Sequence, residues 1–363
     1  MAKTPDSRYF VCILAGGSGE RFWPMSRTRT PKHLLRLVSD RTLLEETVRR
    51  LDGVVRPENI LVLTNQAQLE GIRAALPALG RDQIVAEPAK RDTAPAAALA
   101  TGMVRARCPD GVVALLAADA VIRDGARFGR QLSEAFEWAG GVRWPGSGGT
   151  LLTFGVKPTR PSTGFGYLEL GEELARGDGG TRFIKVRRFV EKPDAATAAD
   201  YVAAGTFVWN AGIFVWGVGT FLAEVGRHSE ELASFVREFP PGDPAAYLAA
   251  RFPSLPRTSI DYALMEKASS VVTLLADFDW DDVGTWAALP GHLSSDAEGN
   301  ATRGPVVAVN STGNIAVSNG RVIALCGVKD LVVVETPDAI LVCHRDAVQE
   351  IKKLQAVLPK EVT

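Results

Sequence analysis

The first part of the chain alternates uninterrupted apolar runs with segments of helical periodicity. Apolar runs at 9–14, 60–64, 84–87 and 112–118 are short enough to be buried strands. The stretches between them repeat apolar residues every three or four positions, which predicts helices such as those at 66–79 and 93–107. Strands that are apolar throughout, when separated by helices, form parallel sheets that helices cover on both faces. We therefore predict an α/β fold with a mixed, mostly parallel sheet.

The pattern then changes without any flexible linker. Strands are predicted at 150–157, 183–190 and 211–216. They form a second lobe, at about 150–220, which we expect to be inserted into a first domain spanning residues 1–290.

Beyond residue 290 the alternation of helices and strands stops. Short β runs separated by turns take its place, at 306–309, 315–317, 322–325, 331–335 and 340–343. We predict a small all-β domain at 291–363, closed by a helix at 346–358, and a small sandwich would fit its irregular repeat. Its exposed strand edges make it a candidate contact in a homodimer.

Composition narrows the class of protein. The 363 residues carry a net charge of −1, so there is no basic footprint for nucleic acid. No segment approaches the roughly 20 apolar residues that span a bilayer. The cysteines are widely spaced without a Cys-x-x-Cys pair, and the histidines are scattered, so neither a zinc site nor a histidine-based triad is indicated. We expect a cytoplasmic protein.

A glycine-rich turn follows the first apolar run and precedes two cations. Such a turn can bring bare backbone N–H groups against phosphate oxygens. The dinucleotide fingerprint fails because its sixth position is Phe22, and a P-loop fails because Glu20 follows the last glycine. An ordinary strand-to-helix turn is the simpler alternative. We predict that a nucleoside triphosphate binds at Leu14, Ala15, Gly16, Gly17 and Gly19, with Arg21 and Lys32 as catalytic cations.

Acidic residues end two apolar runs that are far apart in the sequence. Asp119 ends the run at 112–118, and Asp281 and Asp282 follow the run at 271–278. Carboxylates that converge at strand ends could hold one Mg²⁺, which takes one or two carboxylates and leaves the remaining positions to water and phosphates. A helix N-cap is an equally good reading of Asp119.

Glu87 ends another apolar run, just before a helix that Asp92 or Thr93 would cap. A glutamate there can accept hydrogen bonds from the N1–H and amino group of guanine, whereas adenine presents the opposite pattern. A plain capped helix explains Asp92 and Thr93 but gives no reason for Glu87. We therefore predict that Glu87, Asp92 and Thr93 bind the nucleotide base.

The run Leu-Ala-Gly-Gly-x-Gly-x-Arg-x-Trp-Pro-x-Ser-Arg from Leu14, followed by Pro31-Lys32, resembles the nucleotidyltransferases that make nucleotide sugars. It is most similar to the mannose-1-phosphate guanylyltransferases, and the resemblance covers roughly the whole chain. It implies a Rossmann-like fold of the nucleotide-diphospho-sugar transferase type, with a short left-handed β-helix near the C-terminus.

The resemblance also implies roles for individual residues. It makes Asp282, the aspartate before Val-Gly, the second Mg²⁺ ligand beside Asp119, with Asp281 in reserve. In Glu-Lys-Pro it places Glu191 on sugar hydroxyls and Lys192 on the sugar phosphate. Gly166 and Asn210 match further sugar-pocket positions.

Other family positions are less informative. The segment 259–262 also matches the family, but Ser259 as the cap of a helix predicted at 260–267 explains it equally well, and we assign it no role. Two positions depart from the family pattern, because Ala120 replaces a histidine and Asp92 an asparagine.

The predicted activity is transfer of GMP from GTP to mannose 1-phosphate, giving GDP-mannose, with Mg²⁺ as cofactor. A related enzyme for another sugar phosphate or nucleotide, such as a thymidylyl- or uridylyltransferase for glucose 1-phosphate, is the nearest alternative. The departures at Ala120 and Asp92 would also suit a catalytically silent subunit that senses GDP-mannose. An NAD-linked oxidoreductase is disfavoured because the dinucleotide fingerprint is missing.

Overall fold

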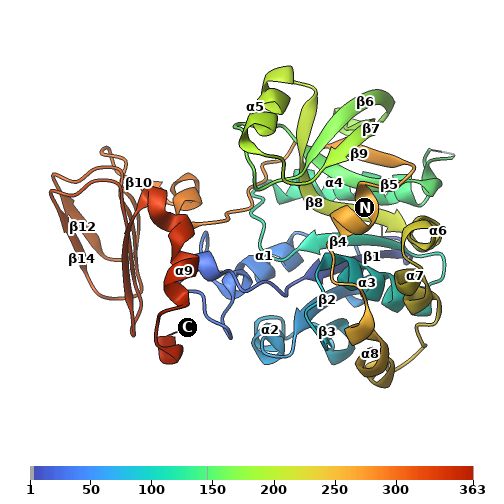
Figure 1. The fold of residues 1–363 in the computed structure, drawn as a ribbon, viewed down its shortest axis with the longest axis horizontal. Coiled ribbons are helices and arrows are strands. Elements are labelled where there is room, and N and C mark those ends of the chain that lie inside the picture. The colour runs from blue at the N-terminus through green and yellow to red at the C-terminus, as the bar shows by residue number, and fades with distance from the viewer. Residues whose placement is uncertain (1–3, 145, 363) are drawn as a thin grey trace.

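A nine-stranded mixed sheet organises the larger part of the molecule (Figure 1). The computed structural model describes residues 4–144 and 146–362. The strand order is β3-β2-β1-β4-β8-β5-β9-β7-β6. In chain order the strands are β1 (Tyr9–Leu14), β2 (Ile60–Asn65), β3 (Ile84–Glu87), β4 (Val112–Ala117), β5 (Leu151–Val156), β6 (Tyr167–Arg176), β7 (Arg182–Val190), β8 (Phe207–Gly217) and β9 (Val271–Leu275).

The sheet is parallel in its first half and mixed in its second. Strands β3, β2, β1 and β4 run parallel, as do β5 and β9, whereas β8 is antiparallel to both β4 and β5. This confirms the predicted Rossmann-like α/β fold. Because β8 joins β4 to β5, the segment predicted as an inserted lobe at about 150–220 continues the same sheet.

Helices bury both faces of the sheet. Along β1, Phe10 and Cys12 pack into one core with α3, whereas Val11 and Ile13 pack into the other with α4. Successive side chains of a strand point to opposite faces, which is why this run has no polar position. The helices are α1 (Leu43–Arg49), α2 (Leu69–Ala75), α3 (Thr93–Arg107), α4 (Gly125–Ala139), α5 (Ala195–Ala204), α6 (Val218–His228), α7 (Glu230–Arg237), α8 (Ala245–Arg251) and α9 (Ile351–Gln355).

The small C-terminal domain has parallel stacked strands rather than hairpins. Strand β13 (Ile315–Ser318) pairs in parallel with β11 (Ala301–Arg303) and β15 (Leu331–Glu335), and β12 (Val306–Val309) pairs in parallel with β14 (Ile323–Cys326). A chain that returns to the same sheets on each turn forms a β-helix, not a sandwich of hairpins. The edge strands β10 (Ser294–Ser295) and β16 (Ile340–His344) are antiparallel to their neighbours.

A ladder of buried asparagines holds these turns together. The Asn314 amide donates to the Asn300 side-chain oxygen at 2.8 Å, and the backbone N–H of Leu331 donates to the Asn314 side-chain oxygen at 2.9 Å. Each side chain thereby satisfies polar groups of the neighbouring turn inside the domain.

The C-terminal domain is fastened to the segment that follows β1. The Trp23 indole donates to the Val362 carbonyl at 2.7 Å, and Trp286, which precedes this domain in the chain, donates its indole N–H to the Trp23 carbonyl at 3.0 Å. From α9, Gln355 donates to the Glu20 carbonyl at 2.9 Å, and Figure 1 shows α9 lying between the β-helix and the larger domain. No helix in the described part of the chain is long and apolar enough to cross a membrane.

Two predicted helices are shorter than their sequence patterns suggested. A helix over 66–79 would include α2, but the Asn65 side chain accepts the N–H groups of Ala67 and Gln68 and forms a turn first. Pro77 then ends the helix early. The predicted C-terminal helix at 346–358 is a 3-10 turn followed by the short α9.

A homodimer contact is predicted for the C-terminal domain from its strand edges, and the outer face of β12 and β14 offers an exposed apolar surface on which such a contact can be tested. Val307 lies opposite Ala324, and Val309 lies opposite Cys326. Val307 and Val309 are 56% and 54% exposed. Figure 1 shows both strands at the end of the molecule that is farthest from the nine-stranded sheet.

We expect Val309→Glu to convert a dimer into a monomer, because a contact between two copies would bury the new charge without a partner. Sedimentation equilibrium measures the change. Val142→Glu is the matched control, since Val142 is 53% exposed and lies in the loop after α4. A monomeric wild-type protein, or equal dissociation of both variants, would contradict a dimer through this face.

Candidate active site

The predicted site residues come from strands that end at one edge of the sheet. Leu14, at the end of β1, lies opposite Leu63 of β2 and Ala117 of β4, and Asn65 lies opposite Glu87 at the end of β3. Ligands of open α/β sheets bind beyond such carboxyl ends. The glycine turn, Glu87 and Asp119 therefore lie along one edge.

The glycine turn leaves its amides available. The Thr64 hydroxyl donates to the Ala15 carbonyl at 2.8 Å and holds the start of the turn. A Cβ atom at Gly16 or Gly17 would meet no atom within 4 Å, and among the described residues neither N–H group has a hydrogen-bond acceptor. These are the properties that a phosphate-binding turn requires.

Gly19 has a different role from the other two glycines. Its φ of +64° lies in the left-handed region, and a Cβ atom there would lie 2.3 Å from the Cβ of Lys32. The glycine therefore lets Lys32 pass directly behind the turn.

Lys32 joins the two predicted metal-binding segments. Its ammonium lies 2.9 Å from the Asp119 carboxylate and 2.6 Å from the carbonyl oxygen of Asp282. The lysine side chain is only 6% exposed, so it lies behind the acids rather than in open solvent. The structure thus brings together Asp119 and Asp282, which are far apart in the sequence.

The environment of the Asp282 carboxyl group disfavours its ionised form. Burial raises its pKa, the Asp119 and Asp281 charges raise it further, and Lys32 and Arg21 oppose the shift. Among the described residues no donor hydrogen-bonds to this carboxylate. The Asp281 carboxylate is otherwise engaged, because it lies 2.8 Å from His292 Nε2 and accepts the Val283 N–H at 2.8 Å.

The two acids suit a divalent cation that is shared with a substrate. Within residues 4–144 and 146–362, no group of three or more His, Cys, Asp or Glu side chains could hold a metal alone. Asp119 and Asp282 could supply the one or two carboxylates that Mg²⁺ commonly takes from a protein. The alternative reading of Asp119 as a helix cap has no support, because Asp124 caps α4 by accepting the Arg127 N–H at 2.9 Å.

Backbone strain is concentrated here. Of the described non-glycine residues, five have positive φ, and three of them are Asp92 (71°), Lys192 (46°) and Val283 (42°). A fully buried β-branched residue such as Val283 is a clear outlier in this region. Strain of this kind persists where the surroundings fix a functional conformation.

The predicted sugar-binding residues line a cavity of about 340 Å³. Its walls include Leu14, Thr93, Gly166, Glu191, Lys192, Asn210, Asp261 and Asp282. Lys192 and Asp282 also line a cavity of about 1100 Å³ that reaches Arg21. Arg21, Lys192, Asp282 and the predicted sugar-binding residues therefore line two adjoining cavities, whereas Lys32 and Asp119 line neither.

Contacts within this cavity fix its polar groups. The Glu191 carboxylate lies 2.5 Å from the Lys192 ammonium and is only 6% exposed. A Cβ atom at Gly166 would lie 2.6 Å from Glu191 Oε2, so the glycine makes room for this carboxylate. The Asn210 side-chain oxygen accepts the Thr153 hydroxyl at 2.7 Å, and its amide donates to Asp261 at 3.3 Å.

Asp261 also lines this cavity, although its sequence match alone assigns it no role. Burial, followed by the Glu191 charge, raises its pKa to about 6. The sequence match at 259–262 was the available signal, and the capping explanation also holds, because Ser259 Oγ accepts the Tyr262 N–H at 3.3 Å. The segment forms a single π-helical turn instead of the helix predicted from residue 260.

The predicted base site has a glutamate with an elevated pKa. Burial, and secondarily the Asp92 charge, raise the pKa of Glu87 to about 7. Asp92 accepts the Thr93 N–H at 2.8 Å and caps α3, while the Thr93 hydroxyl accepts the Ile260 N–H at 2.8 Å. Thr93 therefore ties the base site to the segment that carries Asp261.

The family models and the similar proteins point to the same family of enzymes. The Nucleotidyl transferase family model matches residues 11–298, and a model described as MannoseP isomerase/GMP-like beta-helix domain matches residues 304–358. Alginate biosynthesis protein AlgA of Pseudomonas aeruginosa is 37% identical over 94% of this chain and 70% of its own length. A mannose-1-phosphate guanylyltransferase of Escherichia coli K12 is 36% identical over 96% of this chain and 73% of its own length.

A solved structure resembles the chain over nearly its whole length. It is described as a mannose-1-phosphate geranyltransferase from Thermus thermophilus, and it is 32% identical with a TM-score of 0.85. The match covers 96% of this chain and 98% of that one.

We expect Asp92→Asn to lower the pKa of Glu87 from about 7, because the variant removes a neighbouring negative charge. The pKa should stay above the ordinary value of 4.5, because burial is the larger cause. Carboxyl ¹³C NMR titration measures it, with Glu87→Gln to assign the signal. Asp82→Asn, at the other end of β3, should leave the pKa unchanged, and an equal shift in both variants would contradict the assignment.

Proposed function

The chain belongs to the nucleotidyl transferase family, and on that premise we propose that it transfers GMP from GTP to α-D-mannose 1-phosphate, releasing pyrophosphate and forming GDP-mannose. The relative from Escherichia coli named for this reaction supports the choice of substrates. One observation carries the proposal: Lys32 joins Asp119 to the Asp282 segment beside the cavity that Asp282 and Lys192 line.

The reaction is an in-line displacement at phosphorus. A phosphate oxygen of mannose 1-phosphate attacks the α-phosphorus of GTP, and the bond from that phosphorus to the pyrophosphate oxygen breaks. Pyrophosphate leaves with the bonding electrons. The nucleophile is already an anion, so no side chain needs to remove a proton. The barrier lies in bringing two anions together and stabilising the added charge.

Arg21, Lys32 and the glycine-turn amides would bind the triphosphate. Their unsatisfied N–H groups make Gly16 and Gly17 suitable for phosphate oxygens, and Arg21 lines the larger cavity. Lys32 uses two of its three donors on Asp119 and the Asp282 carbonyl. The third would remain for a phosphate oxygen.

Asp119 and Asp282 would hold Mg²⁺, which when bound supplies positive charge to the triphosphate. The raised pKa of Asp282 supports this role, because a buried carboxylate beside two other acids gains stability from a cation. Asp281 is the weaker choice, since its carboxylate already contacts His292.

The sugar phosphate would bind at the opposite end of the same space. Lys192 would contact the phosphate of mannose 1-phosphate, and Glu191 and Asn210 would accept or donate hydrogen bonds to sugar hydroxyls. Gly166 would act indirectly, because its lack of a side chain makes room for Glu191. Asp261 lies beside Asn210 and is a further candidate for a sugar hydroxyl.

Glu87 would select guanine. As a carboxylate it accepts hydrogen bonds from N1–H and the amino group, which adenine cannot supply in that pattern. Its pKa of about 7 in the free protein means that guanine binding should favour the ionised form and weaken as the pH falls below that value.

We expect pyrophosphate release with GTP and mannose 1-phosphate to exceed that with every other pair in a substrate matrix. The matrix contains GTP, ATP, UTP and dTTP against the 1-phosphates of mannose and glucose. Activity only with UTP or dTTP would overturn the choice of base. Binding of GDP-mannose without turnover for any pair would instead identify a silent sensing subunit.

We expect Asp119→Asn and Asp282→Asn each to lower turnover by about 10²–10³-fold, because each removes charge from the site that stabilises the reacting phosphates. Steady-state kinetics measures the loss, and circular dichroism checks the fold. Asp281→Asn is the discriminating variant and should lose far less. A loss from Asp281→Asn equal to that from Asp282→Asn would show that the wrong acid has been assigned.

A further inference from the structure

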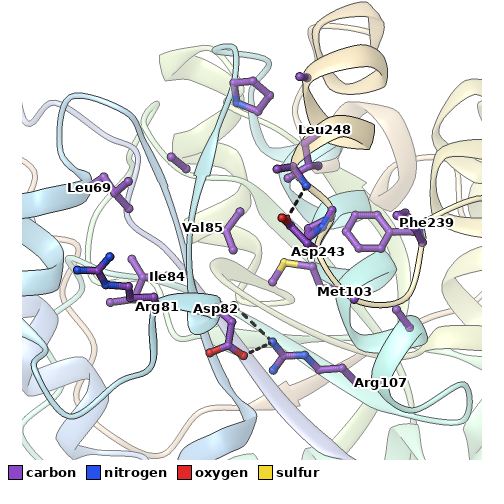
Figure 2. Close-up of a pocket in the computed structure, with 18 of the residues that line it drawn as sticks. Leu69, Arg81, Asp82, Ile84, Val85, Met103, Arg107, Phe239, Asp243 and Leu248 are labelled. Atoms are coloured by element: carbon purple, nitrogen blue, oxygen red, sulfur yellow. Dashed lines mark hydrogen bonds and ion pairs between the residues drawn. The ribbon is translucent and has the colours of Figure 1, made fainter.

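A second cavity, of about 740 Å³, lies on the outer side of β3, the edge strand of the sheet (Figure 2). It is bounded by α2, α3, α8 and the segment that leads into α8. It shares no lining residue with the two cavities of the candidate active site. Its size is typical of a site for a small organic ligand.

The walls of this cavity are mainly apolar. Figure 2 shows Leu69 and Ile84 on one side and Met103, Phe239 and Leu248 on the other, with Val85 of β3 between them. Flexible methionine and flat phenylalanine side chains adapt well to a planar ring. The apolar walls therefore favour a ligand with an aromatic or other flat apolar body.

The charged groups at the rim have an excess of unpaired positive charge. Arg107 forms an ion pair with Asp82 at 3.1 Å, and the two neutralise each other. Arg73 pairs through one terminal nitrogen with exposed Glu70, but its Nε is buried and has no partner among the described residues. Arg81 makes no ion pair with any described residue. A ligand in the cavity does not reach this buried Nε, but no described residue accepts a hydrogen bond from Arg81 or from the second terminal nitrogen of Arg73, so both can donate to an anion.

Asp243 is the remaining acid at the rim, and it does not neutralise the positive charge of Arg73 and Arg81. Asp243 accepts the backbone N–H of Ala245 at 2.9 Å, at the start of α8. Its carboxylate therefore has a local structural partner, whereas Arg73 and Arg81 both have donors to spare.

We propose that this cavity binds a small amphipathic organic anion, with its flat apolar body between Met103, Phe239 and Leu248 and its single negative group on Arg81 and Arg73. The inference does not depend on the proposed reaction. The cavity lies next to the predicted base site, because Val85 and Ala86 line it and the next residue of β3 is Glu87.

The test uses two fluorescent probes that share one apolar body. 8-Anilinonaphthalene-1-sulfonate has a sulfonate, and N-phenyl-1-naphthylamine lacks it. We expect the sulfonate probe to bind the wild-type chain saturably, with a stoichiometry near one. Arg81→Ala should weaken the sulfonate probe about tenfold, because a charge-assisted contact is lost, and should leave the uncharged probe unchanged.

Two further variants complete the test. Ala249→Trp places a large ring at an exposed position of α8 that lines the cavity, and it should abolish binding of both probes. Arg176→Ala is the control, because Arg176 is an exposed arginine at the end of β6. Thermal unfolding confirms that each variant is folded.

Several results would overturn the proposal. They are the absence of saturable binding, equal effects of Arg81→Ala and Arg176→Ala, and retention of binding in Ala249→Trp. Displacement of the sulfonate probe by GTP would place the probe in the nucleotide site instead. Persistence of the probe signal at saturating GTP, together with loss in Ala249→Trp, supports a separate site.

Discussion

The arrangement of the site depends on one buried ammonium group. Lys32 contacts the Asp119 carboxylate and the Asp282 carbonyl, and so connects the segment after the glycine turn with the residues just beyond β4 and with the segment that follows β9. Its approach is possible only because Gly19 has no side chain and adopts a positive φ. Gly19, which the sequence predicts as a phosphate-binding residue, therefore also allows Lys32 to reach both acidic segments.

The same region stores unfavourable electrostatic energy in the free protein. Glu87, Asp261 and Asp282 all have pKa values raised chiefly by burial, and neighbouring acids raise each of them further. Burial of apolar side chains in the two cores on either face of the sheet offsets this electrostatic cost to the stability of the fold. Groups fixed in this way need little reorganisation when charged ligands and cations arrive.

Local signals in the sequence predicted most of the strands of the large sheet, the glycine turn and the acids that follow strands, but not β6. Long-range pairing was less accessible, because nothing in the apolar run of β8 shows that it lies antiparallel between β4 and β5. The burial of Lys32 and the position of Asp261 depend on that pairing and on segments far apart in the chain. In α2, by contrast, the cue is local, because the turn formed by Asn65 shortens the helix.

The fastening of the C-terminal domain limits how such proteins can be recombined. From the C-terminal domain, the Val362 carbonyl accepts the Trp23 indole N–H and Gln355 donates to the Glu20 carbonyl, and both contacts fall on the stretch that carries Arg21. A chimaera that exchanged only the β-helix between homologues would inherit mismatched partners for residues 20–23. The interchangeable module is therefore discontinuous: the β-helix and the turn near the N-terminus would have to be exchanged together.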